Sequence, residues 1–120
     1  AEAARCAGAQ ETSGEAYTTM HTLLFEKQRE WSGQANAADL FAGYASGIGL
    51  DGDSFATCLE NHDTAAAIQA DMQEAQALGI NGTPAFVING HLVSGALPFE
   101  VFVEAVDALI AEAPVEPASN

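Results

Sequence analysis

Two short strand-like segments near the end of this 120-residue chain constrain its fold more than any other feature. PAFVI begins at Pro84, HLVSG begins at His91, and Asn89-Gly90 between them is a strong signal for a tight hairpin turn. Proline cannot donate to a sheet ladder, so Pro84 belongs at the start of its strand. A hairpin alone is only marginally stable in water, so these two strands need further partners.

The first of these strands is apolar on both faces. Phe86 and Ile88 point to one side of the sheet, and Ala85 and Val87 point to the other. Strands of this kind normally lie inside a sheet that is covered on both sides. The sequence supplies only these two good strands. We therefore expect the remaining strands to come from a segment outside these residues or from a partner chain.

Helical patterns account for most of the rest of the chain. Apolar residues recur at helical spacing in stretches that predict helices over residues 1–12, 13–31, 37–49, 54–60 and 63–78, and a last helix after Pro98. The expected caps are Asn36, then Asp53 or Ser54, then Asp63 or Thr64. The expected inward faces are Phe55, Cys58 and Leu59; Ile68, Met72, Ala75 and Leu78; and Phe99, Phe102, Val103, Val106 and Ile110.

The charge of the chain excludes two classes of partner. Lys and Arg total 3 against 17 Asp and Glu, for a net charge of −14. Phosphate binding needs clustered basic residues, so neither nucleic acid nor an anionic membrane surface is an expected partner. No apolar stretch is long enough to span a bilayer, and no membrane insertion is expected. The acidic residues are most simply a solvated surface; a salt-adapted source and a basic partner are the alternatives.

The two cysteines, Cys6 and Cys58, do not form a CxxC motif. They are either two buried free thiols or one structural disulfide, and a disulfide implies an oxidising compartment. The sequence alone leaves both possibilities open.

No metal site or cofactor is predicted. His21, His62 and His91 lie on a helix, a loop and a strand without ligand spacing, and we expect His21 to pack beside the helical core. Asp51 and Asp53 resemble part of a calcium loop, but with Asp51 at position 1 the bidentate Glu of position 12 is replaced by His62.

Two aromatic residues of the second predicted helix, Phe25 and Trp31, have two interpretations. They either form the core or cover of the helical part, or they line a groove that binds a peptide.

Beyond these local patterns, the chain resembles the DsbA-like thiol–disulfide oxidoreductases of thioredoxin fold over nearly all of residues 1–112. The resemblance is carried by AARCAGAQETSGEAYTTMHTLLFEKQ, GLDGDSFATCLENHDTAAAIQADMQEAQALGI and LGINGTPAFVINGHLVSGALPFEVFVEAVDALI, in the family's order. It implies an α/β thioredoxin-like fold that lacks its N-terminal βαβ part. Residues 1–80 would be the helical insertion, 81–112 the C-terminal ββα unit, and 113–120 a flexible tail.

The resemblance also implies roles for particular residues. Gly82, Thr83 and Pro84 match the family's active-site loop, which has a cis bond before the proline, faces the CxxC and holds substrate backbone. Cys6 and Cys58 match a second, structural cysteine pair, which implies that they form a disulfide. No CxxC exists in the chain, so none of its residues is predicted to be the catalytic nucleophile and its status as an enzyme stays open.

Three explanations for the absence of a CxxC motif are open. The chain is part of a complete oxidoreductase, a shortened relative that binds or stabilises without redox activity, or a subunit that pairs with a separate CxxC chain. The implied substrates are cysteine-containing polypeptides in a periplasmic, extracytoplasmic or secreted location. The incomplete sheet predicts a homodimer or larger assembly if the chain is stable alone.

Overall fold

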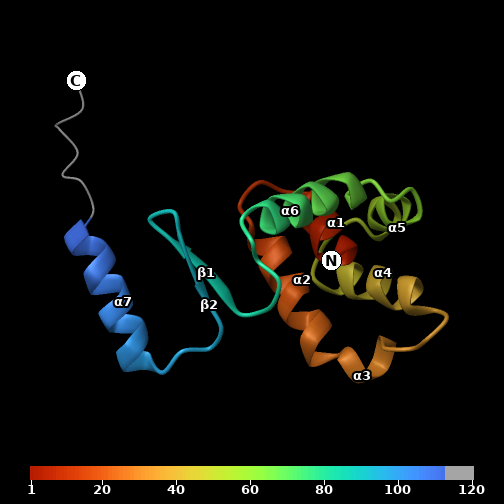
Figure 1. The fold of residues 1–120 in the computed structure, drawn as a ribbon. Helices are drawn as coiled ribbons and strands as arrows, with labels where there is room; N and C mark the ends of the chain where they lie inside the picture. The colour runs from red at the N-terminus through yellow and green to blue at the C-terminus, as the bar shows by residue number, and fades with distance from the viewer. Residues whose placement is uncertain (113–120) are drawn as a thin grey trace. The chain divides into compact units, whose positions relative to one another are not determined.

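The computed structural model describes residues 1–112, and the tail expected at 113–120 lies outside the described residues. Contacts divide the chain into two compact units, Ala1–Ala70 and Asp71–Asn120. The elements, shown in Figure 1, are α1 (Glu2–Gly8), α2 (Glu15–Glu26), α3 (Gln28–Trp31), α4 (Ala37–Gly47), α5 (Gly52–Glu60), α6 (Ala65–Ala77), β1 (Ala85–Ile88), β2 (His91–Ser94) and α7 (Phe99–Glu112).

The core of the first unit is built around the short helix α1, which packs against α2 and α5. Small side chains on α1 let its neighbours approach closely. At Gly8, an added Cβ would lie only 3.1 Å from the Cβ of Tyr17. Met20 and Phe55 are fully buried and supply the largest apolar side chains of this core. The buried cluster is Ala3, Ala4, Cys6, Ala7, Met20, Ala45 and Phe55.

Two predicted helix boundaries in the first unit are wrong. The helix expected over 13–31 breaks at Lys27, which has φ −100° and ψ 16°, so that α2 and α3 are separate. The cap of α5 is Asp51 rather than Asp53 or Ser54, because Asp51 is extended and its Oδ1 accepts a hydrogen bond from the Ser54 N–H at 3.0 Å. That bond is the main cause that lowers the pKa of Asp51.

The second unit contains the expected hairpin. Strands β1 and β2 are antiparallel, with Phe86 opposite Val93 and Ile88 opposite His91. Asn89 and Gly90 both have positive φ, as the primed turns of two-residue hairpins require. Helix α7 contacts the hairpin at Phe86, whose ring meets that of Phe102 edge to face with centroids 5.0 Å apart.

The predicted burial of the second unit is wrong at several of its described residues. Met72 and Leu78 of the segment around α6 are 58% and 49% exposed, and Phe99 and Ile110 of α7 are 74% and 63% exposed. A two-stranded sheet is narrower than the apolar surface of α7, so it covers only part of that helix. The half-buried residues of α7 are Phe102, Ala105, Val106 and Leu109.

None of the helices within residues 1–112 is sufficiently long and apolar to cross a membrane.

Candidate functional site

The candidate site is the exposed loop Gly82-Thr83-Pro84, which leads directly into β1. The peptide bond between Thr83 and Pro84 is cis. The Pro84 carbonyl accepts a hydrogen bond from the Gly95 N–H at 2.8 Å, which extends the ladder of the hairpin by one residue pair. The hairpin therefore holds Pro84 by its backbone and presents Thr83 at the end of the strand.

The backbone groups of Thr83 make no hydrogen bond within the described residues. Among residues 1–112, neither its N–H nor its C=O has a hydrogen-bond partner. Strand β1 pairs only with β2, so its second edge is also open in the described part of the chain. An open edge beside an unpaired backbone segment is the arrangement to which an extended peptide can add as a further strand.

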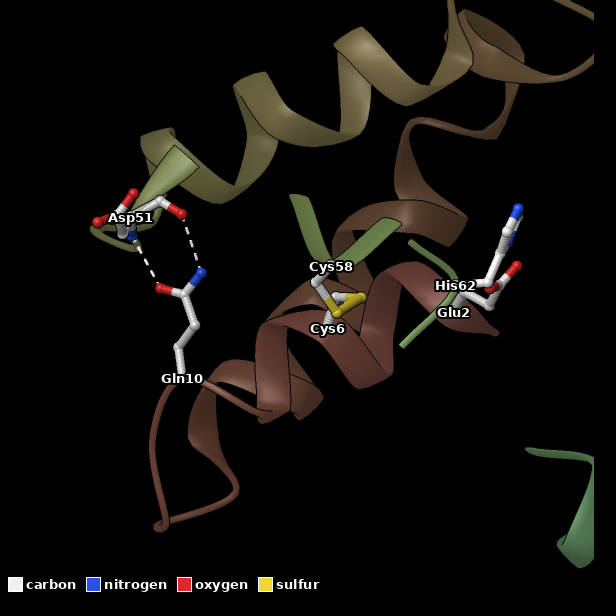
Figure 2. Close-up of a disulfide and its surroundings, with 6 residues drawn as sticks. All are labelled: Glu2, Cys6, Gln10, Asp51, Cys58 and His62. Carbon is white, nitrogen blue, oxygen red and sulfur yellow. Dashed lines mark hydrogen bonds and ion pairs between the residues drawn. A yellow bond between two sulfur atoms is a disulfide. The ribbon is translucent and has the colours of Figure 1, made fainter. Parts of the chain in front are cut away.

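Neither cysteine is a free thiol. Cys6 of α1 and Cys58 of α5 are joined by a disulfide, with their Cα atoms 5.9 Å apart (Figure 2). Cys6 is 1% exposed and belongs to the core of the first unit. No free cysteine remains in the chain. These 120 residues therefore supply no free thiol.

Two polar contacts flank the disulfide. The Gln10 side chain makes a pair of hydrogen bonds with the backbone of Asp51, donating to its carbonyl at 2.9 Å and accepting from its N–H at 2.8 Å. On the other side, His62 Nδ1 lies 2.9 Å from Glu2 Oε1 (Figure 2). These contacts tie the segments before and after α5 to the ends of α1.

The three histidines lie on different elements of the two units. His62 is in the loop before α6, His91 is exposed on β2, and His21 is exposed on α2 rather than packed beside the core as expected. Its ring lies between Tyr17 and Phe25 of the same helix. Within residues 1–112, no group of three or more potential metal ligands is present.

The two aromatic residues with two sequence interpretations, Phe25 and Trp31, both line an open groove of about 550 Å³ in the first unit. Phe25 is 67% exposed. The sequence reasoning missed Tyr17 and His21 as lining residues, although Tyr17, His21 and Phe25 follow one another at intervals of four residues, which places them on one face of a helix. It also missed Phe41, which comes from α4.

The fold and the loop define the class of protein: a thioredoxin-type domain that is mostly helical, with a small two-stranded sheet. The chain belongs to the thioredoxin family, whose model matches residues 1–108.

Particular relatives are much longer than this chain. It is 35% identical over 117 residues to the Na(+)/H(+) antiporter NhaA 1 of Salinispora arenicola, covering 98% of this chain and 17% of that protein. The NhaA 3 antiporter of Salinispora tropica is 34% identical with the same coverage. The ClpXP adapter protein SpxH of Shouchella clausii is 28% identical over 102 residues, covering 79% of this chain and 32% of the adapter. No solved structure gives a significant match.

Proposed function

We propose that this chain is the substrate-holding part of a DsbA-like thiol–disulfide oxidoreductase that acts on cysteine-containing polypeptides. The observation that carries the proposal is the exposed Gly82-Thr83-Pro84 loop, whose Thr83 backbone is unpaired in the described residues. A substrate chain that adds to this backbone as an extended strand would have its cysteine held beside the loop.

The redox step needs a CxxC pair from outside these residues, in the same polypeptide or in a partner subunit. When a substrate is oxidised, its thiolate attacks the CxxC disulfide and forms a mixed disulfide, and one CxxC thiolate leaves. A second substrate thiolate then attacks the mixed disulfide, which leaves a substrate disulfide and a CxxC dithiol. Reduction is the same sequence in reverse, and the direction follows from the reduction potentials of the two couples.

The location and the assembly in this proposal follow from two features. A buried disulfide is typical of oxidising compartments, which favours periplasmic, extracytoplasmic or secreted substrates. The open edge of β1 favours a further strand from the polypeptide or subunit that carries the CxxC. A second copy of this chain is the alternative occupant of that edge.

A redox-inactive interaction module is the second candidate function. It is favoured by the absence of a CxxC in the sequence and by the similarity to a protein named as an adapter. The two candidates differ first in the coding sequence around this chain, because only the oxidoreductase requires a CxxC there or in a partner subunit.

The test uses the full polypeptide, or the complex with the subunit that carries the CxxC, and two substitutions at Thr83. Thr83→Pro removes the backbone N–H, at a position that the following proline already restricts to extended conformations. Thr83→Ala keeps the N–H and removes only the side chain. We expect Thr83→Pro to slow thiol exchange with a cysteine-containing peptide about tenfold, the value of one hydrogen bond, and Thr83→Ala to leave it nearly unchanged.

Stopped-flow measurement of mixed-disulfide formation reads out both variants. Equal exchange rates in both would mean that the Thr83 backbone does not hold substrate. Peptide binding without any exchange in the complete assembly would favour the interaction module.

A further inference from the structure

The segment between α6 and β1 contains the dipeptide Asn81-Gly82, directly before Thr83. An asparagine followed by glycine is chemically unstable, because the backbone nitrogen of the glycine can attack the side-chain carbonyl carbon of the asparagine. The attack needs a mobile backbone and a small following residue, and glycine supplies both. The chain has a second such dipeptide, Asn89-Gly90, in the hairpin turn. The two sites can therefore be compared within one molecule.

The surroundings of Asn81 leave this attack unhindered. Both Asn81 and Gly82 are exposed and lie outside the helices and strands. Among residues 1–112, neither the Asn81 side-chain amide nor the Gly82 N–H has a hydrogen-bond partner. A Cβ added to Gly82 would meet no described heavy atom within 4 Å outside its chain neighbours. Neither a hydrogen bond nor a steric contact in the described residues thus keeps the glycine nitrogen from the asparagine side chain.

The second dipeptide is held in place by the hairpin. Asn89 and Gly90 have φ values of 49° and 81°, and the pairing of Ile88 with His91 closes the turn around them. The Asn89 side-chain amide also donates to the Leu109 carbonyl at 3.5 Å. The attack requires rotation about the Cα–C bond of the asparagine, and the closed turn restricts that rotation. Local opening of the turn must therefore precede any reaction at Asn89.

We propose that Asn81 is a site of spontaneous deamidation, with water as the only co-reactant. The Gly82 nitrogen gives up its proton and forms a bond to Cγ of Asn81. The Cγ–Nδ2 bond breaks, and the side-chain nitrogen takes up a proton and leaves as ammonia. Water then opens the resulting succinimide ring at either carbonyl, which gives aspartate or isoaspartate. No group is oxidised or reduced in these steps.

The product changes the residue that precedes the Gly82-Thr83-Pro84 loop. Either product carries a carboxylate at neutral pH, because the unperturbed pKa of aspartate is about 3.9. Isoaspartate also adds a carbon atom to the backbone directly before Gly82, which displaces the loop from its original position. A displaced loop should slow thiol exchange. This last consequence rests on the proposed function, whereas the deamidation itself does not.

Incubation of the intact protein at mildly alkaline pH, followed by digestion and mass spectrometry, measures the conversion at each asparagine. Electron-transfer fragmentation distinguishes isoaspartate from aspartate. We expect Asn81 to convert about tenfold faster than Asn89 in the folded protein, because opening the turn costs about as much as one hydrogen bond. In concentrated urea the two sites should convert at similar rates, since the hairpin is then absent.

The matched variant is Gly82→Ala, which adds a methyl group beside the attacking nitrogen and fits the open space at this position. It should slow conversion at Asn81 and leave conversion at Asn89 unchanged. Equal rates at the two sites in the folded protein, or an Asn81 that stays unmodified, would overturn the proposal. Anion exchange separates the deamidated form by its added charge. An unchanged rate of thiol exchange by that form in its complete assembly would contradict the proposed role of Thr83, while its formation would still support the deamidation site.

Discussion

At the scale of single residues, the Trp31 side chain satisfies a backbone carbonyl at the end of a helix. Helix α2 stops at Glu26 because the backbone turns at Lys27, so the last carbonyls of α2 lose their helical partners. The indole N–H of Trp31 donates to one of them, the Leu24 carbonyl. The same ring also lines the groove of the first unit. A residue with two sequence interpretations thus serves both the local fold and the groove.

Trp31→Phe should lower the free energy of unfolding by about 1 kcal/mol, because the Leu24 carbonyl loses its donor while a ring remains against Phe41. Urea unfolding followed by circular dichroism measures this change, since Trp31 is the only tryptophan and its fluorescence disappears with it. The control Phe25→Leu lies in the same groove but is mostly exposed, and should stay within about 0.5 kcal/mol of the unchanged protein. An equal effect of both variants would contradict the role of the hydrogen bond.

Single residues also differ in how far their conformation and contacts can be predicted from the sequence. The positive φ values of Asn89 and Gly90 follow from local turn chemistry, so the hairpin was predictable. The cap of α5 was misplaced because Asp51 and Asp53 are both plausible caps, and the choice depends on the extended backbone of Asp51. His21 was expected near the core, but its only ring contacts in the described residues are to exposed neighbours on its own helix.

At the scale of elements, the first unit depends on contacts between segments distant in sequence. The Gln10 side chain holds the backbone of Asp51, 41 residues later, by two hydrogen bonds. Asp51 is also the cap of α5, so Gln10 positions the start of that helix from the segment that follows α1. Helical periodicity carries no signal for such a contact, and it was not predicted.

Gln10→Ala should destabilise the protein by about 1 kcal/mol, since two partly exposed hydrogen bonds are exchanged for bonds to water. Thermal unfolding measures the change, and hydrogen exchange at the Asp51 amide should become faster. Gln34→Ala, in the exposed loop between α3 and α4, should leave the melting temperature unchanged. Slow exchange at Asp51 in the Gln10 variant would show that another group holds this backbone.

The helices themselves were predictable to different degrees. The inward face of α5 was correct at Phe55, which is fully buried. The inward faces expected around α6 and in α7 were wrong at Met72, Phe99 and Ile110, because burial depends on neighbouring elements that these residues do not supply. Periodicity shows which side of a helix is apolar, whereas the extent of its burial is a property of the assembled fold.

At the scale of the whole molecule, the described residues form one unit with a buried core and one without it. Among the described residues, every buried side chain lies between Ala3 and Phe55. The second unit has the hairpin and α7, with apolar side chains exposed on both. The expectation that these two strands require further partners stays a prediction.

Reduction of the Cys6–Cys58 disulfide should lower the free energy of unfolding by about 4 kcal/mol, because the closed loop spans 52 residues. Urea unfolding with and without dithiothreitol measures this difference. The double variant Cys6→Ala with Cys58→Ala should match the reduced protein and be insensitive to reductant. Two titratable thiols in the denatured, non-reduced protein would show that the disulfide is absent in solution.

The position of this disulfide has a consequence for synthesis on the ribosome. Cys58, the partner of Cys6, is added to the nascent chain 52 residues later. Once Cys58 has emerged, every fully buried residue of the described chain has emerged as well, since the last of them is Phe55. The helical unit can then fold and be covalently closed while the hairpin and α7 are still being translated, in keeping with the usual folding of nascent chains unit by unit.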